Sequence, residues 1–67
     1  MSADTYTVVG MTCRHCVASV TEEVGEVSGV DRVEVDLESG GLIVHVSEPV
    51  AREKVEAAVI EAGYRLA

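Results

Sequence analysis

The chain has 67 residues, nearly half of them apolar, so we expect a single globular domain over residues 1–67 rather than a disordered segment. Twelve acidic and five basic residues give a net charge of −7, which disfavours binding to nucleic acid or to an anionic membrane surface. The sequence contains no signal peptide and no apolar run of about 20 residues, so we expect a cytoplasmic protein without membrane insertion.

The first part of the chain shows the pattern of a strand followed by a helix. Residues 4–9 are rich in Thr, Tyr and Val and predict a strand that ends at Gly10. Thr12 is placed to cap the following helix, because its hydroxyl can accept a hydrogen bond from an amide of the first turn. Ser28 and Gly29 end the helix, whose apolar stripe consists of Val17, Val20, Val24 and Val27.

The middle of the chain alternates between apolar and polar residues, which is typical of strands with one buried face. Residues 30–37 and 42–46 predict two strands joined by a glycine-containing turn at residues 38–41, and hence a hairpin. The inward positions are Val33, Val35, Leu37, Leu42, Val44 and Val46. Ile43 and His45 fall on the outward face, so we expect His45 to be a solvated surface residue.

The last part predicts a second helix and a short closing strand. Ser47 is expected to cap the second helix, with Glu48 and Pro49 in its first turn, and Gly63 is expected to end it. The apolar stripe between them consists of Val55, Ala58, Val59 and Ala62, and residues 64–67 are just long enough for a strand. The order strand, helix, strand, strand, helix, strand predicts an α+β fold with a four-stranded antiparallel sheet and both helices on one face.

Cys13 and Cys16 are the only cysteines and lie where the first helix is expected to begin. A helix N-terminus and the neighbouring Arg14 both favour the thiolate form, which is the form that binds metals. Thiolates are soft ligands that select Cu(I), and two sulfurs suffice for a linear Cu(I) site, whereas structural zinc usually takes four ligands. A pair with this spacing can also cycle between dithiol and disulfide, so a small dithiol oxidoreductase remains an alternative.

The segment around these cysteines resembles the GMTCxxC signature of heavy-metal-associated domains, and it reads Gly10-Met11-Thr12-Cys13-Arg14-His15-Cys16. The likeness covers essentially the whole chain, since Ser28-Gly29-Val30 and Glu61-Ala62-Gly63-Tyr64 also match the family. Among its members, the chain looks most like the small bacterial copper chaperones of the CopZ type.

This resemblance implies a ferredoxin-like βαββαβ fold and Cu(I) bound by Cys13 and Cys16, with Cys13 the more exposed of the two. It implies that the protein is not an enzyme, and that it hands copper to the homologous metal-binding domain of a copper-exporting P-type ATPase. The resemblance also suggests two further partners. One is a copper-responsive regulator that receives copper, and the other is a second copy of the chain in a copper-bridged homodimer. Met11 is expected to turn inward and support the loop, and Tyr64 to lie beside the metal site with its hydroxyl able to reach a thiolate.

His15 occupies the variable part of the motif and leaves two roles open. It is either an exposed loop residue that tunes the thiolates or a third ligand across a copper-bridged dimer. Within the same family, a metal-binding domain of a heavy-metal transporter is an alternative to a free-standing chaperone. Tyr64 favours the chaperone, because the ATPase-embedded domains of the family tend to carry Phe at that place.

Overall fold

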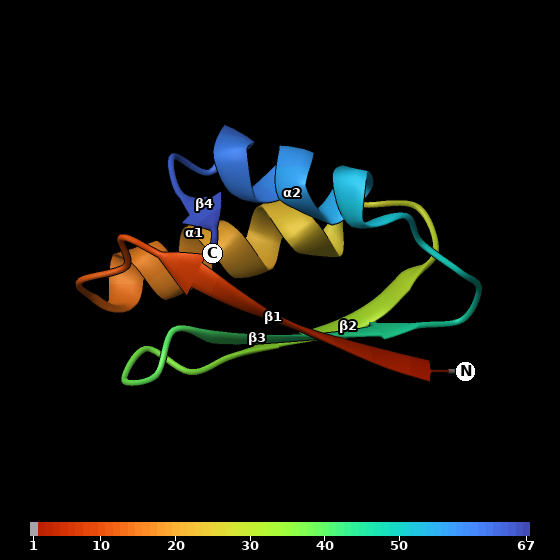
Figure 1. Ribbon diagram of the computed structural model, residues 1–67, viewed down its shortest axis with the longest axis horizontal. Helices are drawn as coiled ribbons and strands as arrows, with labels where there is room; N and C mark the ends of the chain where they lie inside the picture. Colours follow the sequence, from red (N-terminus) through yellow and green to blue (C-terminus); the bar gives the residue numbers. More distant parts are fainter. Residues whose placement is uncertain (1) are drawn as a thin grey trace.

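The computed structural model describes residues 2–67 and contains four strands and two helices in the expected order. The elements are β1 (Ser2–Val9), α1 (Arg14–Gly25), β2 (Val30–Val35), β3 (Gly41–Val46), α2 (Arg52–Glu61) and β4 (Arg65–Leu66). The strands form one antiparallel sheet in the order β2-β3-β1-β4, and both helices lie on the same face of it (Figure 1). The predicted ferredoxin-like α+β fold is therefore confirmed. Neither helix is long and apolar enough to cross a bilayer.

The core lies between the sheet and the two helices and is built almost entirely of valine and leucine. The helices contribute Val20, Val24, Val55 and Val59, and the sheet contributes Val8, Leu42, Val44, Val46 and Leu66. Burial of apolar side chains is the main driving force for folding. Because aromatic side chains are almost absent, these aliphatic side chains supply most of it. The predicted stripes are confirmed at these positions, but Val17 is only half-buried, and Val27 lies beyond the end of α1 and is also half-buried.

The β2–β3 hairpin is shorter than the sequence predicts, because β2 ends at Val35 and not at Leu37. The Asp36 carboxylate accepts hydrogen bonds from the Glu38 amide at 3.0 Å and the Ser39 hydroxyl at 3.1 Å, which turns the chain out of the strand. Gly40 sits at a φ of 77°, and a Cβ there would lie 2.7 Å from the Val8 carbonyl oxygen. This close approach of the turn to β1 requires glycine.

The second helix begins later than predicted, at Arg52, and its N-cap residue is Ala51. Ser47 does not cap it, because the Ser47 amide and hydroxyl both donate to the Gly29 carbonyl, at 3.0 and 3.4 Å. Ser47 therefore ties the end of β3 to the loop before β2. Strand β1 also begins earlier than expected, at Ser2, where it pairs with Val46 of β3.

His45 lies on the outward face of the sheet, as predicted, but it is not simply solvated. Its side chain is only 30% exposed and its ring forms a short hydrogen bond with the Glu34 carboxylate. The Arg32 guanidinium lies 3.6 Å from the same carboxylate. The hydrogen bond from His45 and the charge of Arg32 lower the pKa of Glu34. These three residues form a polar cluster on the face of the sheet opposite the helices.

We predict that Val59→Ala will lower the free energy of unfolding by about 2 kcal/mol, because it removes two buried methyl groups and leaves a cavity. Val59 is fully buried, whereas Ile60, the next residue in α2, is 58% exposed. The matched variant Ile60→Ala should therefore change stability by no more than about 0.5 kcal/mol. Urea denaturation of both variants measures the difference, and equal effects would contradict this account of the core.

Candidate metal site

The loop from Gly10 to Cys13 connects β1 to α1 and lies beside the loop that leads into β4. Gly10 has a φ of 101°, and a Cβ at this position would lie 3.5 Å from the Tyr64 ring. Met11 is half-buried and packs against the core, as expected for a side chain that supports the loop from within. Both Met11 and Tyr64 pack against the core, so the loop lies close to it.

Helix α1 begins at Arg14, and its N-cap residue is Cys13, not Thr12. The Cys13 carbonyl accepts the first helical hydrogen bonds, from the Cys16 amide at 3.0 Å and from the Val17 amide at 3.4 Å. Cys13 makes no side-chain capping bond, so its sulfur is free of the helix backbone. The prediction that the Thr12 hydroxyl caps the helix is therefore wrong.

Thr12 instead contacts the sulfur of Cys16. Its amide N–H donates to Cys16 Sγ at 3.5 Å, and its hydroxyl lies 3.9 Å from the same sulfur. Sequence reasoning missed this role, because a main-chain donor leaves no signature in the residue type. The only signal was the position of Thr12 in the turn that leads into the helix, where amides lack helical partners.

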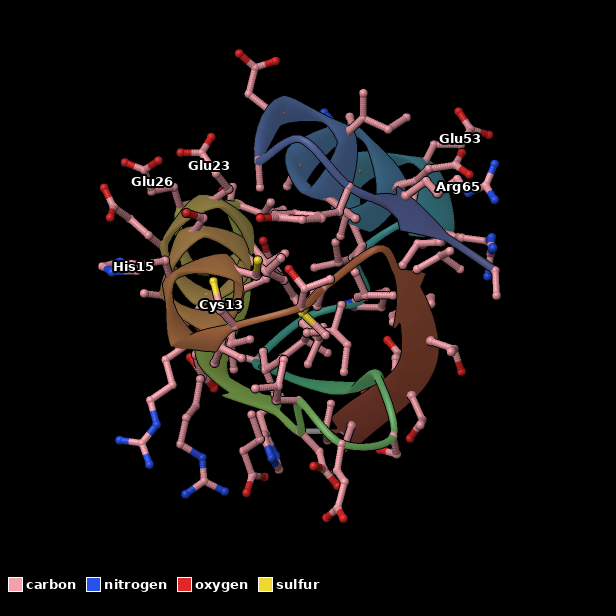
Figure 2. The ribbon with its side chains drawn as sticks, turned by 90° about the vertical axis from the view of Figure 1, so that its left-hand side faces the viewer. Cys13, His15, Glu23, Glu26, Glu53 and Arg65 are labelled. Atoms are coloured by element: carbon pink, nitrogen blue, oxygen red, sulfur yellow. The ribbon has the colours of Figure 1, made fainter. Side chains whose placement is uncertain are left out.

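The two cysteine sulfurs lie 3.5 Å apart at the start of α1. Cys13 is exposed and Cys16 is buried, as expected. Metal–thiolate bonds are about 2.3 Å long for zinc, so a single ion of similar size can contact both sulfurs. Figure 2 looks onto this end of the molecule and shows Cys13 at the tip of the helix.

The surroundings of Cys16 stabilise its thiolate. The Thr12 amide makes the largest contribution, followed by a hydrogen bond from the Tyr64 hydroxyl, and together they outweigh burial and lower the pKa of Cys16 to about 6. The same contact with Cys16 raises the pKa of Tyr64, so its hydroxyl keeps its proton and remains a donor. Tyr64 therefore acts on the pKa of Cys16, whereas a direct role of its hydroxyl in the metal site stays a prediction. At neutral pH, Cys16 carries a negative charge that attracts a cation.

His15 does not join the two sulfurs within one chain. It is exposed on the first turn of α1, and Figure 2 shows its ring pointing outward from the helix, on the side away from Cys13. Nowhere in residues 2–67 do three or more histidine, cysteine or acidic side chains converge as a metal site would require. The structure therefore brings Cys13 and Cys16 together with Tyr64 nearby, and Met11 packs against the core.

We predict that Tyr64→Phe will raise the pKa of Cys16 from about 6 toward the ordinary thiol value of 9.0, because it removes one of the donors to this sulfur. The ¹³Cβ chemical shift of Cys16, followed against pH in the reduced protein, measures the midpoint. The pKa of Cys16 is lower in the folded protein than in the unfolded chain, so ionisation of this thiol stabilises the wild-type fold. The free energy of unfolding should therefore increase as the pH is raised from about 6 to 9.0, and this contribution should be lost when the pH is lowered again. A variant with the same midpoint as the wild type would show that Tyr64 does not act on the sulfur.

The chain is similar to known proteins over nearly its whole length. The model of the heavy-metal-associated domain family matches residues 5–65. The chain is 44% identical to a COP-associated protein of Helicobacter felis, with 88% of this chain and 89% of the relative covered. It is 39% identical to the copper chaperone CopZ of Enterococcus hirae, with 90% and 88% covered. A solved copper-binding domain of a P-type ATPase superposes with a TM-score of 0.92 at 29% identity, covering 100% of this chain and 92% of that domain. The chain therefore belongs to the heavy-metal-associated domain family.

Proposed function

We propose that this protein is a copper chaperone that binds Cu(I) between Cys13 and Cys16 and passes it on by ligand exchange. The observation that carries the proposal is the pair of sulfurs 3.5 Å apart, one exposed and the other a buried thiolate. The relative named a copper chaperone, similar over nearly its whole length, supports copper as the cargo.

The ligand set favours Cu(I) over other ions. Two thiolates suit a soft monovalent ion that accepts two-coordinate binding, whereas zinc usually takes four ligands in a structural site. No third ligand converges on the pair among residues 2–67. Thiols of this kind stay reduced in the cytosol, which is where we place the protein.

The unequal burial of the two sulfurs suggests how copper leaves. Cys16 is fixed by its place in α1, whereas the Cys13 sulfur is exposed and has no capping role. A thiolate of the acceptor adds to the two-coordinate ion from the exposed side and forms a three-coordinate intermediate. Cys13 then dissociates, followed by Cys16, and each sulfur–copper bond that breaks is replaced by one to the acceptor.

The acceptor that we propose is the homologous metal-binding domain of a copper P-type ATPase. The resemblance of this chain to such a domain supports it, because two domains of one fold can present similar loops to each other. Two identical chains that meet through the same loops would form a copper-bridged homodimer. Delivery to a copper-responsive regulator follows the same exchange chemistry.

We predict that the reduced protein will take up about one Cu(I) per chain in an anaerobic titration against a competing chelator, because two thiolates satisfy this ion. The double variant Cys13→Ser, Cys16→Ser should lose this uptake, and Met11→Leu should retain it. Weak uptake that the chelator removes at once, together with rapid disulfide exchange, would overturn the proposal in favour of a dithiol oxidoreductase.

We predict that His15→Gln will leave the copper stoichiometry unchanged, because the ring of His15 points away from Cys13 (Figure 2). Copper per chain and apparent mass, measured together by size-exclusion chromatography with metal analysis, test this. Loss of a copper ion per dimer in the variant would assign His15 as a ligand across the dimer interface.

A further inference from the structure

Strand β1 has a stretch of unpaired edge. On one side it pairs with β3 from Ser2 to Thr7, but on the other side β4 pairs only with Val8 and Val9. One further bond, from the Ala67 amide to the Thr7 carbonyl at 2.8 Å, ends the contact. Among the described residues no strand lies beside residues 2–6 on this side, and Figure 1 shows β1 running on well past β4. We call residues 2–6 on this side the open β1 edge.

The main-chain groups along this edge can be assigned from the pairing. Thr7 directs its carbonyl toward β4, whereas the amide of Val8 donates to the Gly40 carbonyl on the opposite side of β1. Main-chain groups alternate along a strand, so Ala3 and Thr5 direct their N–H and C=O groups to the open β1 edge. Unpaired groups of this kind form a template for one more strand.

The side chains beside the open β1 edge favour a particular partner. Asp4 and Tyr6 pair with Val44 and Leu42 of β3, which are buried, so both lie on the helix side of the sheet. The Arg52 guanidinium lies 5.6 Å from the centre of the Tyr6 ring and donates to the Ala67 carbonyl at 3.3 Å. Asp4 has no ion-pair partner among residues 2–67, so its charge is available to an incoming strand.

We propose that the open β1 edge binds an extended segment of a protein partner as an additional antiparallel strand, with a basic side chain opposite Asp4. The net charge of −7 also favours a basic segment. A second copy of this chain is a poor occupant, because symmetric pairing of residues 2–6 places Asp4 opposite Asp4, and like charges in that position are destabilising.

The open β1 edge is remote from the two cysteines. Ala3 lies six residues before the end of β1 at Val9, or about 20 Å along the strand, and the loop that carries Cys13 begins only after it. A segment bound there leaves the sulfurs exposed to a second protein. The proposal therefore stands or falls independently of copper binding.

The test uses the metal-free ¹⁵N-labelled protein and two end-blocked peptides of seven residues. One alternates threonine with lysine and the other alternates threonine with glutamate. Amide shift changes and slowed hydrogen exchange should concentrate at Ala3 and Thr5, and the lysine peptide should bind roughly fivefold more tightly. Changes confined to β2 or to the outward sheet face, or no changes with either peptide at millimolar concentration, would overturn the proposal.

Two variants of Thr5 provide the matched comparison. Thr5→Pro removes an amide that faces the open β1 edge and is not needed for pairing with β3, so binding should be lost while the fold persists. Thr5→Val keeps that amide and should bind as the wild type does. If Thr5→Pro disturbs the fold, Asp4→Lys provides an independent test, because it should weaken the preference for the lysine peptide. Unchanged preference in Asp4→Lys, or an increase in mass that shows self-association, would contradict the proposal.

Discussion

The candidate site depends on the fact that one of its two sulfurs belongs to the hydrophobic core. Cys16, Val20 and Val24 follow one another at intervals of four residues, and all three are buried on the inner face of α1. The packing that fixes the rotation of the helix against the sheet therefore also fixes the position of Cys16 Sγ. Cys13 is placed in turn, because it caps the same helix and its sulfur lies within reach of the first. The stability of the fold and the geometry of the sulfur pair thus have one origin.

Both halves of the fold contribute to the charge of that buried sulfur. The Thr12 amide comes from the loop after β1, whereas Tyr64 comes from the turn after α2, where its own amide donates to the Val59 carbonyl at 3.0 Å. These two donors replace the hydration that Cys16 loses on burial. A buried thiolate without them would take up a proton, so the second βαβ unit is part of the site although it supplies no cysteine.

The arrangement of elements was predictable because the core consists of valines and leucines at regular spacing. Val20, Val24 and Val55 identify the inner faces of the helices without any knowledge of tertiary contacts, and the family motif identifies the cysteine pair. The errors occurred where a polar side chain or amide chose among several local partners. Thr12 and Ser47 were both expected to cap helices, but Thr12 binds a sulfur and Ser47 binds the Gly29 carbonyl. Such choices are decided by residues distant in sequence, which a local pattern does not contain.

The loop that carries Cys13 holds its shape without backbone strain. Among the described residues, positive φ angles occur only at glycines, and Cys13 itself has an extended conformation with φ of −155°. The energy that keeps the sulfurs in place therefore resides in hydrogen bonds and packing, rather than in distorted torsions that binding would release. Rotation of the exposed Cys13 side chain changes the distance between the sulfurs while the buried stripe of α1 stays intact. The first step of the proposed ion exchange, release of Cys13, therefore needs movement of one side chain and not a rearrangement of the fold.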